Sequence, residues 1–237
     1  MSSSNKPSSL GTSDHWSTVY TQELENYRTN KAHRGDVWYG EEAEDDAVDW
    51  YCDLWDEYKC KGTTLDIGCG NGSMTVKLAK SGRLGKVTGS DYVQSSVDLT
   101  RQVLDDEGLS TVSVYTDDLR SSRWGSGKDG GLLGGVIDKV RSDEGSERSE
   151  LPDTVMQHAN PPHSSLRSSP RSSLHSSQGT MDALLLLPSN TAGMYYDGVN
   201  GMLEPGGIVL ITSCNSSAEE CRGWYEGEGK WEYLGDR

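Results

Sequence analysis

The segment LDIGCGNG at residues 65–72 places one aspartate, Asp66, two positions before the first of three glycines, Gly68, Gly70 and Gly72. Glycines allow the tight turn by which a strand passes into a helix at a nucleotide site. Their GxGxG spacing differs from the GxGxxG fingerprint of dinucleotide sites, where a diphosphate rests on the helix N-terminus. The alternative is a strand-to-helix turn without a ligand.

Asp66 favours one class of nucleotide on electrostatic grounds. We expect its carboxylate at the mouth of the glycine turn, where it would repel a diphosphate and attract an ammonium group. S-adenosylmethionine carries an ammonium and a sulfonium group and no phosphate. The segment therefore predicts a site for S-adenosylmethionine, with a nicotinamide dehydrogenase as a distant alternative.

Further acids follow the next two predicted strands. Asp91 ends VTGSD, where an acid can accept both ribose hydroxyls; its alternative role is to cap the helix predicted over 93–107. Asp117 and Asp118 in YTDDL follow the third strand. A carboxylate there can accept a hydrogen bond from the adenine amino group, while a backbone N–H of this segment, which extends to Leu119, donates to a ring nitrogen. The alternative is an exposed acidic turn. We expect all these acids at one edge of the sheet.

The elements that must position these residues alternate between strand and helix patterns. Strands are predicted over 63–67, 86–90, 111–116, 132–137 and 208–213, and helices over 71–80, 93–107, 190–203 and from Ser216. Such alternation predicts an α/β, Rossmann-like doubly wound fold with a mostly parallel sheet.

Two amphipathic helices are predicted ahead of this core. The first begins with Ser13 or Asp14 as its cap and carries an apolar stripe of Trp16, Tyr20, Leu24 and Tyr27. The second ends near Tyr58. The chain thus divides into a disordered tail (1–12), N-terminal helices (13–58) and a core (59–237).

Residues 140–178 interrupt the core. They hold eleven serines and four prolines and no Phe, Tyr or Trp. Because such a composition buries too little apolar surface to fold, we expect this insertion to be disordered.

Composition limits the partners of the protein. Its 237 residues fit one domain, and its net charge of -15 disfavours nucleic acid and favours a basic protein partner. The five cysteines are odd in number and lack CxxC spacing, so we expect reduced thiols in a cytoplasmic protein and no metal site. No apolar run reaches the roughly 20 residues of a membrane span. We expect a monomer.

Several motifs resemble those of one family. LGTSDHW (10–16), DVWYGEE (36–42), TLDIGCGNG (64–72), IDK (137–139) followed by GTMDALLL (179–186), and ITSCN (211–215) are similar to motifs of class I, seven-stranded methyltransferases. The narrower resemblance is to the eukaryotic protein-lysine methyltransferases that modify translation elongation factor 1-alpha. It implies S-adenosylmethionine as cofactor and that elongation factor as protein substrate.

The resemblance also suggests how methyl transfer would be arranged. The acceptor lysine must lose a proton, because an ammonium has no lone pair. We expect Asp138, at the end of the fourth strand, to orient the amine, and Trp38 and Tyr39 to line the substrate channel. Asp138 could instead serve only as a turn or cap acid, and Asp182 is a lesser candidate. A catalytically silent cofactor-binding module and a small-molecule methyltransferase are the alternative functions.

The chain departs from the family pattern in two places. In the family DK runs directly into GT, whereas here the insertion separates them. Since valine codons begin with GT and CAG encodes glutamine, we hypothesise a retained intron from Val140 to Gln178; its presence in every transcript would refute this. Family members also continue into a strand between the fifth and sixth, so we expect that C-terminal strand to be missing and a sheet edge to be unpaired.

Overall fold

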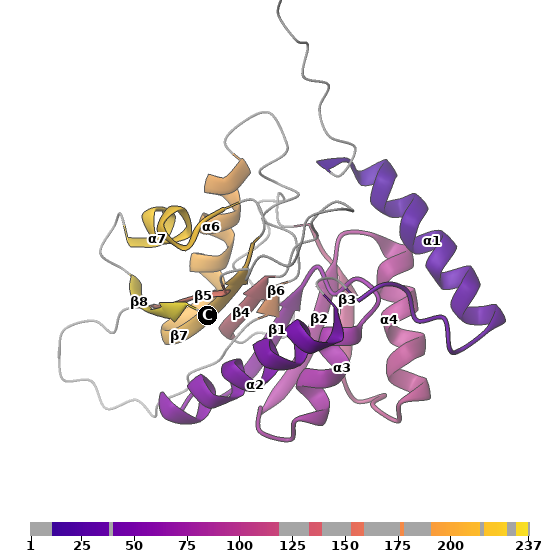
Figure 1. The fold of residues 1–237 in the computed structure, drawn as a ribbon, viewed down its shortest axis with the longest axis horizontal. Helices are drawn as coiled ribbons and strands as arrows, with labels where there is room; N and C mark the ends of the chain where they lie inside the picture. Colours follow the sequence, from indigo (N-terminus) through magenta and orange to yellow (C-terminus); the bar gives the residue numbers. More distant parts are fainter. Residues whose placement is uncertain are drawn as a thin grey trace, which may run out of the picture.

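The structure is a computed structural model that describes residues 11–37, 40–118, 133–138, 153–158, 176–177, 191–213, 216–226 and 231–236. Within these ranges, strands and helices alternate along the chain and build a central sheet with helices on both faces (Figure 1). This arrangement confirms the predicted α/β class.

The strand order of the sheet is β3-β2-β1-β4-β7-β5-β8. Five strands that are neighbours in this order pair in parallel: β1 (Thr63–Ile67), β2 (Lys86–Asp91), β3 (Ser113–Thr116), β4 (Leu133–Asp138) and β7 (Leu203–Thr212). Their helices are α3 (Ser73–Lys80), α4 (Gln94–Asp106), α6 (Thr191–Met202) and α7 (Ala218–Glu226). Because these strands are parallel, their carboxyl ends lie at one edge, as the sequence predicted.

Strand β7 shows how both faces of the sheet are buried. Ile208 and Leu210 pack in the apolar cluster with α2 (Glu41–Glu57) and α3, while Val209 and Ile211 pack in the cluster with α6 and α7. This alternation of buried side chains is the period of a strand covered on both sides. Figure 1 shows α2 and α3 on one side of the sheet and α6 and α7 on the other.

Strand β5 (Asp153–His158) corrects the prediction that residues 140–178 are disordered throughout. It runs antiparallel between β7 and β8 (Trp231–Asp236), and its Met156 pairs with Val209 and Tyr233. Met156 is fully buried. The average composition of the insertion hid this short stretch, in which Val155 and Met156 provide apolar side chains for a strand.

Strand β5 also corrects the expectation of an unpaired edge. It occupies the place between β7 and β8 that the family resemblance assigns to a later strand, so both of these strands have a neighbour there.

The insertion meets the sheet a second time close to the glycine turn. Strand β6 (Ser176–Ser177) pairs in parallel with Asp66 and Ile67 of β1. Strand β4 ends at the carboxyl edge of the sheet with Asp138, two residues before the insertion begins, and β6 lies at the same edge near the end of the insertion.

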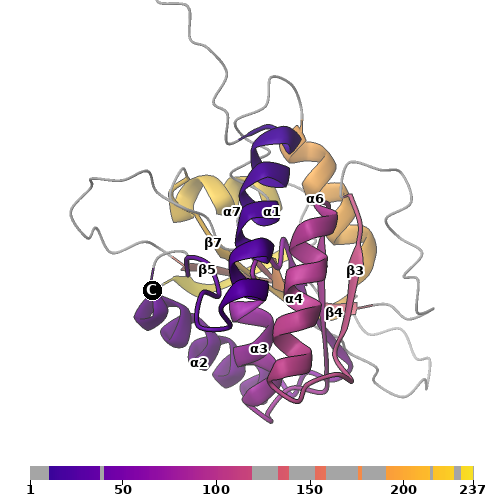
Figure 2. The ribbon, with the colours of Figure 1, turned by 90° about the vertical axis from the view of Figure 1, so that its right-hand side faces the viewer.

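The first helix, α1 (Ser13–Thr29), buries the predicted stripe of Trp16, Tyr20, Leu24 and Tyr27 against α4 (Figure 2). Its cap differs from the prediction. Thr12 is the N-cap, and its Oγ1 accepts a hydrogen bond from the His15 N–H at 3.4 Å, so Ser13 and Asp14 lie inside the helix. Among the described residues, no helix is both long and apolar enough to cross a membrane.

Candidate cofactor site

The glycine turn joins β1 to α3 through backbone conformations that favour glycine. Gly68, Gly70 and Gly72 have φ of 71°, 57° and 82°. A Cβ at Gly70 would lie 2.7 Å from the Tyr20 hydroxyl oxygen, and one at Gly72 would lie 2.8 Å from Thr100 Cγ2. Larger residues would therefore be strained and would collide with α1 or α4.

The N–H groups of the glycine turn are bonded within the protein. Those of Gly68 and Cys69 donate to the Ser90 carbonyl at 2.7 and 2.9 Å, that of Gly70 to Asp91 Oδ2 at 3.1 Å, and that of Gly72 to the Cys69 carbonyl at 2.8 Å. A diphosphate binds where several N–H groups at a helix start are free to donate. These four N–H groups already donate to protein acceptors, which agrees with the sequence argument against a dinucleotide ligand.

Asp66 lies deeper than the sequence argument placed it. Its side chain is fully buried beneath the turn, and one carboxylate oxygen accepts a hydrogen bond from the Thr75 hydroxyl of α3. The carboxylate is therefore fixed by its own protein rather than exposed at the mouth of the site. Its attraction for a cofactor ammonium stays a prediction.

Asp91 is surrounded by donors from two elements. Its Oδ1 accepts from the Val93 N–H at 2.9 Å, and its Oδ2 accepts from the Gly70 N–H at 3.1 Å and from Ser96 Oγ at 2.7 Å. Burial raises the pKa of Asp91 from its ordinary 3.8, while these hydrogen bonds oppose the rise. Asp91 thus secures the start of α4 and the glycine turn, and its bond to ribose stays a prediction.

The two acids after β3 lie next to Asp91. The Asp117 N–H donates to the Asp91 carbonyl at 2.9 Å, and the Asp118 N–H donates to Asp117 Oδ1 at 3.0 Å. Both are half-buried, and Leu119 lies outside the described residues. The structure thus brings together the ends of β1, β2 and β3, as predicted, without testing the contacts to adenine.

The proposed substrate residues are only partly described. Asp138 is the last residue of β4 and pairs with Ile211. Because Leu65 pairs with Val136, Asp138 lies level with Ile67 at the carboxyl edge of the sheet. Trp38, Tyr39 and Asp182 lie outside the described residues, as does every side chain of β4.

Two residues that the sequence analysis missed connect α2 and the segment before it to the glycine turn and the start of α3. Asn71 Nδ2 donates to the Asp36 carbonyl at 2.9 Å, and Asn71 Oδ1 accepts from the Ser73 N–H at 3.1 Å. Glu44 of α2 is 2% exposed and accepts from Ser73 Oγ at 2.6 Å. Glu44 precedes Ala47 by three residues on the apolar stripe of α2, and that spacing could have revealed it.

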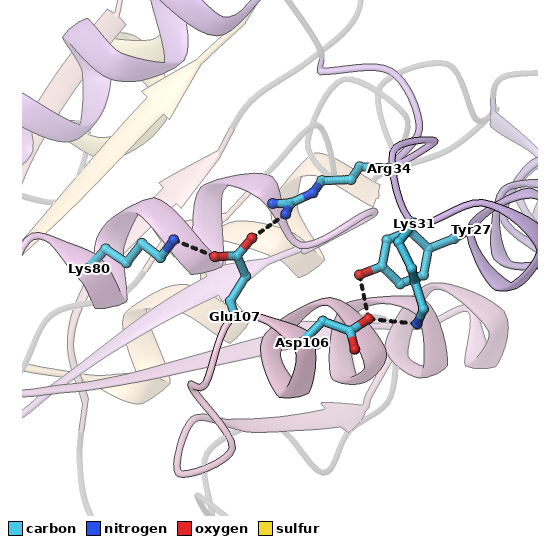
Figure 3. Close-up of polar contacts among 6 residues, drawn as sticks. All are labelled: Tyr27, Lys31, Arg34, Lys80, Asp106 and Glu107. Carbon is cyan, nitrogen blue, oxygen red and sulfur yellow. Dashed lines mark hydrogen bonds and ion pairs between the residues drawn. The ribbon is translucent and has the colours of Figure 1, made fainter.

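A polar cluster holds α1 and the residues after it on the core (Figure 3). Tyr27 Oη and Lys31 Nζ donate to Asp106 at 2.7 and 2.6 Å. Arg34 and Lys80 both bind Glu107. The hydrogen bonds from Lys31 and Tyr27 lower the pKa of Asp106. Those from Lys80 and Arg34 lower the pKa of Glu107. We call these six residues the α1 clasp.

The residues around the glycine turn fit S-adenosylmethionine. The three glycines of the turn have no side chains, four N–H groups of the turn are bonded within the protein, and acids stand at three strand ends. Ser90 Oγ, which is 1% exposed at the carboxyl end of β2, has no hydrogen-bond partner in the described part of the chain. A buried polar atom without a partner is the kind of group that a ligand satisfies.

The fold and the glycine turn are those of a class I methyltransferase. The family profile described as a methyltransferase domain matches residues 59–232, so the chain belongs to this family, whose cofactor is S-adenosylmethionine. A solved S-adenosylmethionine-dependent methyltransferase from Clostridium acetobutylicum is similar, with a TM-score of 0.47 and 12% identity, covering 81% of this chain and 56% of that one.

Curated relatives narrow the family. The chain is 30% identical over 220 residues to EEF1A lysine methyltransferase 2 of Homo sapiens, covering 90% of this chain and 72% of the relative. It is 28% identical over 223 residues to protein-lysine N-methyltransferase EFM4 of Saccharomyces cerevisiae, covering 90% and 79%. Within the methyltransferases, the chain belongs to the EEF1A lysine methyltransferase 2 family.

Proposed function

We propose that this enzyme methylates a lysine side chain of translation elongation factor 1-alpha. The observation that carries the proposal is the combination of the glycine turn with relatives named for this activity over 90% of the chain. The net charge of -15 supports a basic protein as partner and disfavours nucleic acid. We propose a monomer in the cytoplasm, where the described cysteines, all buried free thiols, would stay reduced.

S-adenosylmethionine supplies a methyl group on a sulfonium, which an amine attacks in line with the bond that breaks. The protein has to hold that amine in place and leave it neutral; burial helps because it lowers the pKa of a lysine from about 10.4. Asp138 ends β4 at the carboxyl edge of the sheet, and we propose that it orients the amine there. We propose that Trp38 and Tyr39 line its channel, supported by the anchoring of Asp36 on Asn71.

A catalytically silent cofactor-binding module is the second candidate function. It is favoured by the pairing of β6 with Asp66 and Ile67, which brings the insertion to the edge where substrate would enter. A small-molecule methyltransferase has no comparable support.

Purified elongation factor 1-alpha and S-adenosylmethionine labelled in its methyl group test the proposal. We expect label in the elongation factor, in a fraction that grows with enzyme and time. Calorimetry with unlabelled cofactor is the companion measurement. Cofactor binding without any label transfer would establish the catalytically silent module. Label found only in small molecules would establish a small-molecule methyltransferase.

A further inference from the structure

Tyr20 lies where α1 meets the glycine turn. It belongs to the buried stripe of α1 and is 8% exposed. Its hydroxyl oxygen lies 2.7 Å from the position that a Cβ at Gly70 would take. The hydroxyl therefore faces the middle glycine of the cofactor turn, a position that packing of the stripe alone does not require.

Among the described residues, the structure gives Tyr20 a ring contact with Trp16 and its hydroxyl no hydrogen bond. The other two buried tyrosines of this half of the molecule differ. Tyr27, on the same face of α1, donates to Asp106 at 2.7 Å, and Tyr51 donates to Thr64 Oγ1 at 3.4 Å. Since buried tyrosine hydroxyls normally find a partner, Tyr20 has donor capacity left for a ligand.

The neighbouring acid, Asp91, accepts its hydrogen bonds from other donors. Asp91, whose charge acts on Tyr20, already accepts hydrogen bonds from Gly70, Val93 and Ser96. Burial, followed by the charges of Asp91 and Glu23, raises the pKa of Tyr20 well above its ordinary 10.0. The hydroxyl therefore stays protonated at neutral pH and can donate.

We propose that the Tyr20 hydroxyl donates a hydrogen bond to an oxygen of bound S-adenosylmethionine, either a ribose hydroxyl or the carboxylate of the methionine tail. Helix α1 then forms part of the cofactor site. The inference rests on the cofactor-dependent function proposed above and deepens it.

Calorimetric titration of Tyr20→Phe with S-adenosylmethionine tests the inference. Phenylalanine keeps the ring and removes only the oxygen, so we expect roughly a five- to tenfold loss of affinity, the effect of one hydrogen bond to a ligand. Tyr27→Phe is the matched control, because it removes a hydroxyl from the same face of α1 that is bonded to Asp106 instead. It should lower thermal stability and leave the affinity within about twofold.

Titration with 5′-methylthioadenosine, which keeps the ribose and lacks the amino-acid tail, identifies the acceptor. A loss for both ligands assigns the ribose, and a loss for S-adenosylmethionine alone assigns the carboxylate. Unchanged affinity of folded Tyr20→Phe for S-adenosylmethionine would overturn the inference and leave the proposed function intact. Failure of the unmodified protein to bind S-adenosylmethionine would overturn both.

Discussion

At the scale of single residues, the acids of the cofactor site are held by donors from neighbouring elements. Asp66 is bonded to Thr75 of α3, and Asp91 is bonded to the glycine turn and to Ser96 of α4. The sequence was sufficient to predict that these acids gather at one edge, because strand ends are visible in the pattern. It could not reveal their depth or partners, which depend on how separate helices pack.

Asp66 and Thr75 allow charge and hydrogen bonding to be tested separately. Asp66→Asn keeps an oxygen that can accept from Thr75 and removes the charge, so we expect S-adenosylmethionine to bind more weakly by about 1–3 kcal/mol. Thr75→Val keeps the charge and removes the donor. It should lower the free energy of unfolding by about 1–3 kcal/mol, because it removes a hydrogen bond from a buried carboxylate.

Calorimetry for cofactor affinity and urea unfolding for stability distinguish these effects. Equal cofactor affinity for Asp66→Asn and the unmodified protein would show that the buried charge does not attract the ammonium group.

At the scale of elements, α1 combines a predictable helix with an unpredictable position. Its aromatic stripe indicates that one face is buried but does not name the surface that covers it. That surface is α4 together with the glycine turn, which Tyr20 reaches. Partners such as Lys31 and Asp106 are far apart in sequence, so the α1 clasp could not be read from local spacing.

The α1 clasp should stabilise the protein in a manner that depends on salt and pH. We compare the double variant Asp106→Asn, Glu107→Gln with Asp105→Asn, which changes an exposed acid of the same helix. The double variant should have a lower melting temperature at low ionic strength, and the difference should shrink near 1 M salt, where screening is strong.

The pH dependence follows from the direction of the two shifts. Pairing lowers the pKa of Asp106 from 3.8 and that of Glu107 from 4.5 in the folded protein. The stabilisation is therefore fully present above those ordinary values and is lost as pH falls through the lowered folded values. A melting difference that is the same at every pH and salt concentration would contradict an electrostatic clasp.

At the scale of the whole molecule, the parallel core was predictable and its antiparallel side was not. Strands β1 and β2 have the apolar and glycine-bounded patterns that identify them, and their bounds agree with the prediction within a residue. Strand β5 was hidden in a serine-rich insertion, and its pairing with β7 joins residues far apart in sequence. The strand from Leu203 also continues through Pro205, where the sequence favoured the end of a helix.

Met156→Ala tests whether the insertion is part of the folded sheet. Met156 is fully buried against β7 and β8, so we expect a loss of about 2–5 kcal/mol in the free energy of unfolding by urea. Tyr58→Ala serves as control, since Tyr58 is 37% exposed and its removal should have a small effect. Unchanged stability of Met156→Ala would place β5 outside the folded core and favour the retained-intron hypothesis.

The central claim is that the glycine turn serves methyl transfer to a lysine of elongation factor 1-alpha. Two glycines provide a matched pair of variants: Gly70 and Gly82 have φ of 57° and 66°, but only Gly70 is crowded, by Tyr20, while Gly82 has open space around it. Both alanine substitutions carry similar backbone strain of about 1–2 kcal/mol. Only Gly70→Ala should disturb the cofactor site.

The decisive measurement is mass-spectrometric mapping of methyl groups on elongation factor 1-alpha after incubation with S-adenosylmethionine and each folded protein. We predict methylated lysine with the unmodified enzyme and with Gly82→Ala, and a severe loss with Gly70→Ala. An elongation factor left unmethylated by an unmodified enzyme that binds S-adenosylmethionine, or methylated equally by all three proteins, would contradict the claim.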